Sequence, residues 1–322
     1  MREKFSKKLI GGDLFAISIV LALIILFLVF SSDGFASQYN LNNLLKTIAI
    51  IILVGLSQLS VLSIGHFNLA LGSMGCLTGM LTGFLLQSIN LPIMVILLIG
   101  LLVGALVGFI QGAFIVKTKI NPFIVTLAFV SIYLGLVVGT TKGEVFTALP
   151  GSFVGIERID LLFGVPLLLI VSIGVAGMLI VLFHKTAIGR QVLATGENFK
   201  ASVFAGINTS LTVIVAHTLS GILAGAAGLM QICRLGAATP SIGSDWLLIS
   251  FAAPILGGTI LSGGKVSIVG TILGAMLMSI IVNGLFLLDV SHYWFQTFLG
   301  GILLGSYEIN KLKRKYILRR PF

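Results

Sequence analysis

Apolar runs long enough to cross a lipid bilayer fill most of this chain and leave little room for any other kind of fold. One spanning helix needs about 20 apolar residues, and ten runs of roughly that length lie at residues 14–31, 45–64, 67–89, 91–116, 120–141, 161–184, 210–232, 246–262, 266–288 and 293–309. The chain is 57% hydrophobic and only 9% charged, whereas soluble domains carry about a quarter charged residues. The sequence therefore predicts an all-α, polytopic integral membrane bundle of about ten transmembrane helices.

The polar stretches between these runs are short. None is long enough for an independent soluble domain, so residues 1–322 are expected to form a single transmembrane domain. Basic tails at 1–13 and 310–322 flank it, and the longest polar insert is the segment 185–209. Any large catalytic or ligand-binding domain that works with this chain must therefore be another polypeptide.

The positive charge is distributed unevenly. When the spans alternate across the bilayer, all of the 20 Lys and Arg residues fall on one side except Lys46, Lys142, Arg158 and Arg234. Cytoplasmic segments carry such an excess, so we expect a multi-pass cell-membrane protein with both termini in the cytoplasm. This topology explains the net charge of +10 without a nucleic-acid partner. Contact between the C-terminal cluster and lipid headgroups is a second interpretation of that cluster.

Glycine repeats at four-residue steps indicate tight helix packing. A four-residue step puts glycines on one helix face, where another backbone can approach closely. The repeats are Gly100, Gly104, Gly108 and Gly112; Gly75, Gly79 and Gly83; and Gly221, Gly225 and Gly228. The pattern favours a compact bundle but does not identify a function.

The segment 185–209 is too polar for lipid, because charged side chains are costly inside a bilayer. It still has a helical pattern, with few helix breakers and with apolar residues at Ile188, Val192 and Leu193 and at Val203 and Phe204. A membrane protein with a compact amphipathic element in the cytoplasm has a surface for a soluble partner. We therefore expect this segment to receive force from another protein.

Catalytic and nucleotide-binding motifs are missing from the sequence. There is no HExxH, CxxC or GxSxG motif. GTILSGGKV at 258–266 fails the phosphate-loop pattern, because Thr259 stands where Gly is required and Val266 where Ser or Thr is required. The chain is therefore not expected to be an enzyme or to bind a cofactor or metal. We expect 258–266 to be a tight turn, and Cys76 and Cys233 to serve packing only.

A candidate solute site lies in SIGHFNLALGS at 63–73. Its glycines permit a broken helix, and non-helical backbone at membrane depth is tolerated only inside protein or beside a cavity. His66 and Asn68 can each donate and accept hydrogen bonds, and Phe67 can stack on the apolar face of a sugar. A helix break that serves structure alone is the alternative.

Several stretches together resemble the membrane permeases of ribose-type ABC sugar importers. SIGHFNLALGS is similar to the family signature glycine-isoleucine-aspartate-leucine-serine-valine-glycine-serine, and NPFIVTLAFVSIYLGL to the next marker. AIGRQVLATGENFKASVFAGI resembles the segment that docks on the ATPase. SGILAGAAGL, GAATPSIGSDW, APILGGTILSGGKVSIVGTILGAML and IVNGLFLL resemble the C-terminal half in order. The resemblance runs from about residue 45 to 305.

The resemblance implies partners that supply energy and solute. These are a cytoplasmic ABC ATPase, which binds ATP and Mg²⁺, an extracytoplasmic solute-binding protein, and a second permease subunit, identical or a sister. It implies that the coupling segment includes Gly189, Arg190, Gly196, Glu197, Asn198, Ala201 and Gly206, and that His66, Phe67 and Asn68 lie near the solute path.

The sequence departs from the family pattern at several positions. Asn68 replaces the signature's Asp, Ala70 its Ser, and Val266 a Gly, while residues 247–250 lack the usual acidic residues. Without the Asp, a charge-assisted hydrogen bond to a polyol is lost, which leaves ribose itself in doubt. The expected function is import of a sugar or sugar-like solute. The alternatives are a permease for a nucleoside, autoinducer or branched-chain amino acid, and an ion-coupled carrier that works without an ATPase.

Overall fold

The computed structural model describes residues 2–305 except 90, 162–163, 292–293 and 302–303. Its helices are α1 (Arg2–Ser31), α2 (Gln38–Leu62), α3 (Leu71–Ser88), α4 (Ile93–Thr118), α5 (Pro122–Thr141), α6 (Gly151–Val154), α7 (Leu167–Lys185), α8 (Ala187–Glu197), α9 (Phe199–Phe204), α10 (Thr209–Leu235), α11 (Trp246–Leu256) and α12 (Ile268–Leu287). Between α6 and α7 lie a 3₁₀ helix, η1 (Gly155–Arg158), and the antiparallel strands β1 (Asp160–Leu161) and β2 (Val165–Pro166). The predicted all-α membrane class is confirmed.

The number of spans differs in detail from the prediction. Within the described residues, seven helices are long and apolar enough to cross a bilayer, namely α1, α2, α4, α5, α7, α10 and α12. The expected span at 246–262 is wrong in length, because α11 has only 11 residues and so covers about 16 Å of a core about 30 Å thick. The run at 67–89 becomes the glycine-rich α3, which begins at Leu71. The run at 293–309 and the tail at 310–322 lie partly or wholly outside the described residues.

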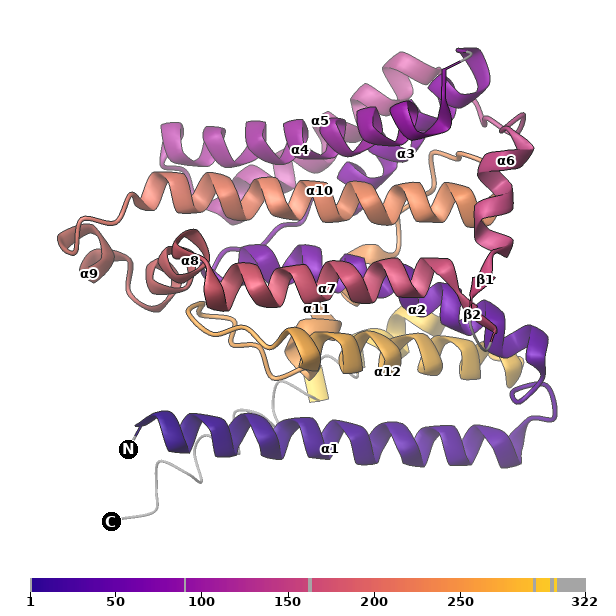
Figure 1. The fold of residues 1–322 in the computed structure, drawn as a ribbon, viewed down its shortest axis with the longest axis horizontal. Helices are drawn as coiled ribbons and strands as arrows, with labels where there is room; N and C mark the ends of the chain where they lie inside the picture. Colours follow the sequence, from indigo (N-terminus) through magenta and orange to yellow (C-terminus); the bar gives the residue numbers. More distant parts are fainter. Residues whose placement is uncertain (1, 90, 162–163, 292–293, 302–303, 306–322) are drawn as a thin grey trace.

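The long helices lie side by side along one direction, and the connecting elements gather at the two ends (Figure 1). One end carries α8 and α9. The other carries residues 142–166, called here the cap, which contains α6, η1 and the β1–β2 hairpin. We name these the α8–α9 end and the cap end. The tail expected at 1–13 is helical from Arg2 onward, as part of α1.

Burial divides the helices into a centre and a periphery. In an apolar 18-residue stretch of each helix, 89% of the residues are buried in α2 and 67% in α10. The buried share is only 28% in α4, α5 and α7 and 11% in α1. The peripheral helices expose many large apolar side chains, such as Leu98 and Leu102 of α4 and Ile124 and Val138 of α5. Because lipid solvates such side chains, the periphery is suited to hydrocarbon.

The glycine repeats bring helix backbones into contact around α10, as the sequence predicted. A Cβ atom at Gly104 would lie 2.7 Å from the carbonyl oxygen of Gly221, and one at Gly108 would overlap the carbonyl oxygen of His217. Further along the same face of α10, a Cβ at Gly228 would overlap the backbone of Gly75 in α3. Side chains would hold α4 and α3 away from α10, so these glycines set the separation of the three helices.

Two stretches interrupt the helices inside the bundle. The first is 63–70, between α2 and α3, where Gly65 has a φ of +73°. The second is 236–245, between α10 and α11, where Gly243 has a φ of +79°. The second stretch touches the start of α3, directly after the first, because a Cβ at Gly72 would overlap the carbonyl oxygen of Gly243. The broken helix expected near 63–73 is therefore present, and a second break lies against it.

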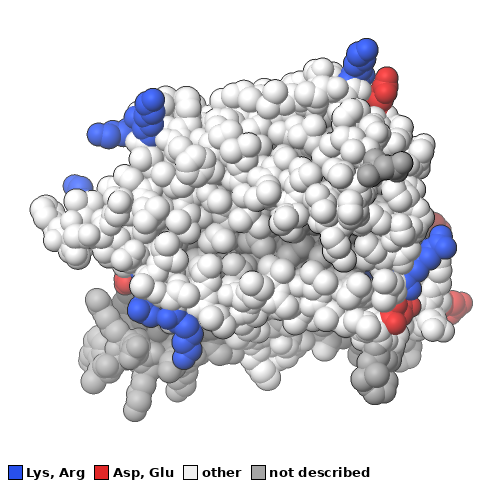
Figure 2. Space-filling model, turned by 45° about the horizontal axis from the view of Figure 1, so that its top comes forward, with Lys and Arg blue, Asp and Glu red and all other residues white. Residues whose placement is uncertain are grey.

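Charged side chains mark the two ends of the molecule. On the face drawn in Figure 2, they gather at the ends and leave an uncharged band between them. Lys46 of α2 and Glu157 of η1 form an ion pair of 3.1 Å whose side chains are only 10% and 19% exposed. The cap also pairs with the bundle through the bridge between Phe146 and Ala238. The cap is therefore fixed to the bundle.

We predict that Gly108→Ala lowers the stability of the bundle, because the new methyl group must push α10 away from α4. Overpacking of this kind costs about 1–3 kcal/mol. The matched control is Gly139→Ala in α5, where a Cβ meets no atom within 4 Å and alanine favours the helix. Thermal denaturation of the detergent-solubilised protein should give a lower Tm for Gly108→Ala alone. Equal Tm values for both variants would contradict the close packing of α4 on α10 at Gly108.

Candidate functional site

The side chain of Asn68 is the centre of a buried polar network. It is completely buried, although it lies in the non-helical stretch 63–70. Its Nδ2 donates to Ser220 Oγ of α10 at 3.0 Å. Its Oδ1 accepts from Gln111 Nε2 of α4 and from the backbone N–H of Ala70, both at 3.0 Å. A buried amide with these partners fixes the break against α4 and α10, and its side chain is fully engaged in this conformation.

Two histidines extend the network. His66 Nδ1 lies 3.4 Å from His217 Nε2, and His217 Nδ1 lies 3.5 Å from Gln111 Nε2. In the contact between the rings, one nitrogen must donate and the other accept, so at least one imidazole is neutral. Gln111 Oε1 is buried and has no hydrogen-bond partner among the described residues. The network thus retains one free acceptor.

Phe67 connects the non-helical stretch 63–70 to two further helices. Its ring packs against Phe251 of α11 with centroids 5.7 Å apart, and its carbonyl oxygen accepts a 3.3 Å hydrogen bond from Thr126 Oγ1 of α5. His66, Phe67 and Asn68 therefore contact α4, α5, α10 and α11 between them. Their assignment to the solute path stays a prediction.

Sequence reasoning missed the partners of Asn68. Gln111, Ser220 and His217 all lie within long apolar runs, and sequence reasoning assigned none of them a role. A signal was present for Gln111, because Gly108 and Gly112 flank it on the glycine face that packs on α10. A polar side chain beside such a face is directed into the bundle rather than into lipid.

The polar segment 185–209 forms two helices rather than one. Thr186 caps α8, because its Oγ1 accepts from the N–H of Gly189 at 3.1 Å. Asn198 ends α8 and caps α9, with its Oδ1 accepting from the N–H of Ala201 at 3.0 Å. Gly206, with a φ of +76°, follows α9. Asn198 and Ala201 thus owe their positions to helix capping.

Gly196 joins this segment to the break between α2 and α3. A Cβ at Gly196 would overlap the carbonyl oxygen of Ser63 and lie 2.6 Å from the nitrogen of Gly264. The same Ser63 oxygen accepts a 2.9 Å hydrogen bond from Gly264 N–H. The stretch 258–266 is the tight turn that the sequence predicted, with positive φ at Gly258, Gly263 and Gly264. Three chain segments therefore meet, backbone against backbone, at the α8–α9 end.

The outer face of the segment combines charge with apolar side chains. Arg190 and Glu197 are exposed, and Arg190 Nη1 donates to the carbonyl oxygen of Lys185 at 3.1 Å. Phe199, Val203 and Phe204 of α9 are 55%, 50% and 91% exposed. Large apolar side chains on a polar element outside the membrane-spanning helices mark a contact surface. Sequence reasoning noted the apolar periodicity but did not identify Phe199.

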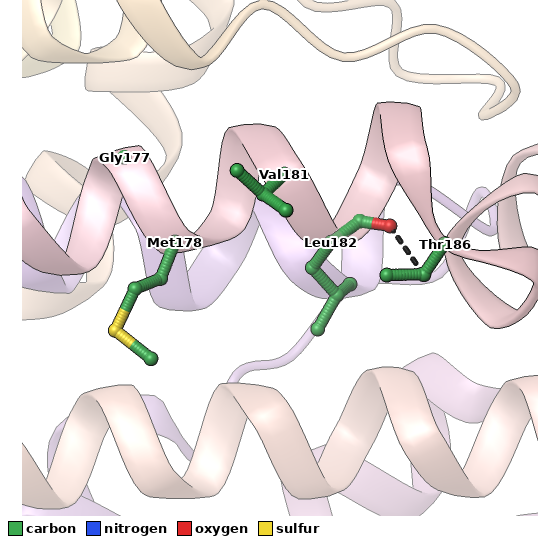
Figure 3. A pocket seen from close by; sticks show the side chains of 5 residues that line it. All are labelled: Gly177, Met178, Val181, Leu182 and Thr186. Carbon is green, nitrogen blue, oxygen red and sulfur yellow. Dashed lines mark hydrogen bonds between the residues drawn. The ribbon is translucent and has the colours of Figure 1, made fainter.

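An open groove follows α7 and carries no chemistry for a polar solute. Figure 3 shows its lining by Gly177, Met178, Val181, Leu182 and Thr186. Its one hydroxyl, on Thr186, already donates to the carbonyl oxygen of Leu182 at 2.6 Å. Within the described residues, no three of His, Cys, Asp and Glu come close enough together to hold a metal ion.

Comparison with known proteins identifies the family. The profile of the family described as "Branched-chain amino acid transport system / permease component" matches residues 40–307. No solved structure matches the chain.

The similar curated proteins are permease proteins named for sugars. The chain is 35% identical to the ribose import permease protein RbsC of Bacillus subtilis, over 91% of this chain and 92% of that protein. It is 28% identical to the D-allose transport system permease protein AlsC of Escherichia coli, over 94% and 92%. It is 27% identical to the xylose transport system permease protein XylH of Haemophilus influenzae, over 97% and 99%. The resemblance drawn from the motifs is thus confirmed, and the chain belongs to this family of membrane permease components.

Proposed function

We propose that this chain is the membrane-spanning subunit of an ATP-driven importer that carries a sugar or sugar-like small solute into the cell. The named solutes of its relatives, ribose, D-allose and xylose, are all sugars. A separate cytoplasmic ATPase binds ATP and Mg²⁺, a solute-binding protein delivers the solute from outside, and a second permease subunit completes the path.

The observation that carries this proposal is the contact between α8 and the break in the bundle. Gly196 lies against Ser63 and Gly264 with no side chain between them, and Ser63 begins the stretch that contains His66 and Asn68. Backbone contacts have little room to yield, so a displacement of α8 acts directly on Ser63. Closure of an ATPase against α8 therefore moves the break, and with it the network around Asn68, between discrete arrangements.

The docking surface consists of Phe199, Val203 and Phe204 on α9, with Glu197 and Lys200 beside them. Both charges and all three apolar side chains are exposed. An apolar anchor with a charged rim is the usual anatomy of a protein interface. Gly189, Arg190, Asn198, Ala201 and Gly206 shape the two helices that present this surface.

The orientation follows from the charge. The α8–α9 end carries Lys117, Lys119, Lys185, Arg190, Lys200 and Lys265, and an excess of Lys and Arg faces the cytoplasm. We therefore assign this end, with both termini, to the cytoplasm and the cap to the outside.

His66, Phe67 and Asn68 lie on the inner part of the solute path in this proposal. They border both α4 and α10, and the free Gln111 Oε1 offers an acceptor there. An importer of branched-chain amino acids is the second candidate, because the family description names that solute class. An ion-coupled carrier would continue uptake without any ATPase.

We predict that Gly196→Ala abolishes ATP-dependent uptake while the protein still inserts in the membrane. The added methyl group would overlap Ser63 O and separate α8 from the break. The matched control is Gly174→Ala on α7, where a Cβ meets nothing within 4 Å. Uptake of radiolabelled D-ribose, D-allose and D-xylose is measured in cells that express the whole importer. Wild-type uptake by Gly196→Ala would contradict the proposed route of force, and uptake that persists after deletion of the ATPase would overturn the importer.

We predict that Phe204→Ser weakens assembly with the ATPase at least tenfold, because it removes the most exposed apolar side chain of α9. The control is Tyr39→Ser, which removes a side chain that is 82% exposed at the start of α2, near the cap end. Co-purification of the ATPase with the tagged permease measures the effect. If as much ATPase co-purifies with Phe204→Ser as with wild type, α9 is not part of the interface with the ATPase.

We predict that Asn68→Leu lowers both uptake and stability. The change leaves Gln111 Nε2 and the N–H of Ala70 without their acceptor, and each unsatisfied buried group costs about 1–3 kcal/mol. Asn43→Leu on α2 is the control, since the Asn43 side chain makes no hydrogen bond within the described residues. Tm and uptake are compared for the two variants. Equal Tm and equal uptake for the two variants would show that the hydrogen bonds of Asn68 contribute neither to stability nor to transport.

A further inference from the structure

The segment 236–245 returns from the cap end into the bundle. Ala238 pairs with Phe146 of the cap, so the segment begins at the outer surface. It ends at Asp245, the residue that precedes α11. Non-helical backbone that enters a membrane protein must be buried or must line a water-filled cavity. In this segment Ile242 and Gly243 are buried, whereas Ser241 and Asp245 are exposed.

Asp245 directly precedes α11, a helix too short to cross the bilayer. The far end of α11 leads into the turn at 258–266, which contacts α8 through Gly264 and Glu197. The 11 residues of α11 rise about 16 Å from that end, which is half of a core about 30 Å thick. A carboxylate at this depth is costly unless it faces water or a partner. Asp245 has no hydrogen-bond or ion-pair partner within the described residues.

A cavity of about 190 Å³ meets this carboxylate. It is enclosed by α2, by the end of α10, by 236–245 and by the start of α11. Its polar lining consists of Thr47, Gln231, Arg234, Thr239, Ser241 and Asp245. Its volume is below the 300–1,000 Å³ that is typical of pockets for drug-sized ligands, so it is suited to one small solute.

Within the described residues, no hydrogen bond or ion pair engages the side chains of Gln231 and Asp245. Arg234 makes none either, but the charge of Glu157 in the cap acts on it. The hydroxyls of Thr239 and Ser241 meet only each other, at 3.0 Å. The positive charge of Arg234 and the negative charge of Asp245 balance each other within the lining, so the cavity does not favour a charged solute. Free amide, carboxylate and hydroxyl groups together match the alternating donors and acceptors of a polyol.

The floor of the cavity is closed. There Gly243 meets Gly72 backbone to backbone, and the Trp246 ring packs against Gly75 of α3. These contacts separate the cavity from the network around Asn68. A solute in the cavity would therefore be held on the cap side of the contact between 236–245 and the start of α3.

We propose that this cavity is the outer binding site of the permease for a single uncharged, hydroxyl-rich solute of monosaccharide size. Asp245 and Gln231 hydrogen-bond its hydroxyl groups, and Arg234 lies nearer the cap end. The inference rests on the proposed function for its transport step and names the residues that receive the solute from the binding protein.

The first test uses the importer reconstituted in liposomes with its ATPase and its solute-binding protein. Asp245→Asn and Gln231→Leu are compared with Glu144→Gln, an exposed acidic residue in the cap that lies outside the cavity lining. We expect both cavity variants to lower D-ribose, D-allose or D-xylose uptake at least tenfold, while ATP hydrolysis stimulated by the loaded binding protein stays within twofold of wild type. The control should change neither. Wild-type uptake by both cavity variants, or a preference of the wild type for leucine over all three sugars, overturns the proposal.

The second test does not depend on transport. Ser241→Cys in the full-length permease is treated with a membrane-impermeant thiol reagent from the outer face, with wild type as the baseline because Cys76 and Cys233 are buried. Labelling of the variant is expected, and no labelling above the baseline overturns the water-filled site. A wild-type complex without ATP-dependent uptake would count against the proposed function instead, and the labelling result would still decide whether the site is open to water.

Discussion

Close backbone contact around α10 is the constraint on which the other features of this protein depend. Glycines of α4 and α3 let two neighbouring helices approach α10 to a separation that no side chain would allow. Lipid tails are as apolar as the helices, so close packing has to supply the cohesion that the hydrophobic effect supplies in water. The central position of α10 then puts Ser220 and His217 within hydrogen-bond reach of the first break.

The same packing explains how two non-helical stretches persist inside a membrane protein. The start of α3, directly after residues 63–70, meets 236–245 where Gly72 contacts Gly243, so both non-helical stretches are held inside protein, where such backbone is tolerated. One break leads to the turn against α8, and the other leads to the cap. A change at either end of the molecule therefore reaches the same contact in the middle.

Much of this arrangement could be predicted from local sequence. The glycine repeats, the break near 63–73, the turn at 258–266 and the capped polar segment all follow from spacing or from single-residue preferences. The short length of α11 and the partners of Asn68 could not be predicted from local sequence. Hydropathy does not distinguish α11 from the start of a full span, because its 11 residues are as apolar as those of a spanning helix. The pairing of Gln111 and Ser220 with Asn68 depends on the rotation of α4 and α10 about their axes, which only the assembled bundle fixes.

The first helix, α1, lies at the edge of this packing. α1 is the least buried of the candidate spans, packs chiefly on α12, and precedes residues 40–307, which the family profile matches. Among the described residues, the contacts named above between the breaks, the cap and α8 do not involve α1. Its place in the bundle depends on α12, where the missing side chain at Gly284 makes room for Leu28 of α1.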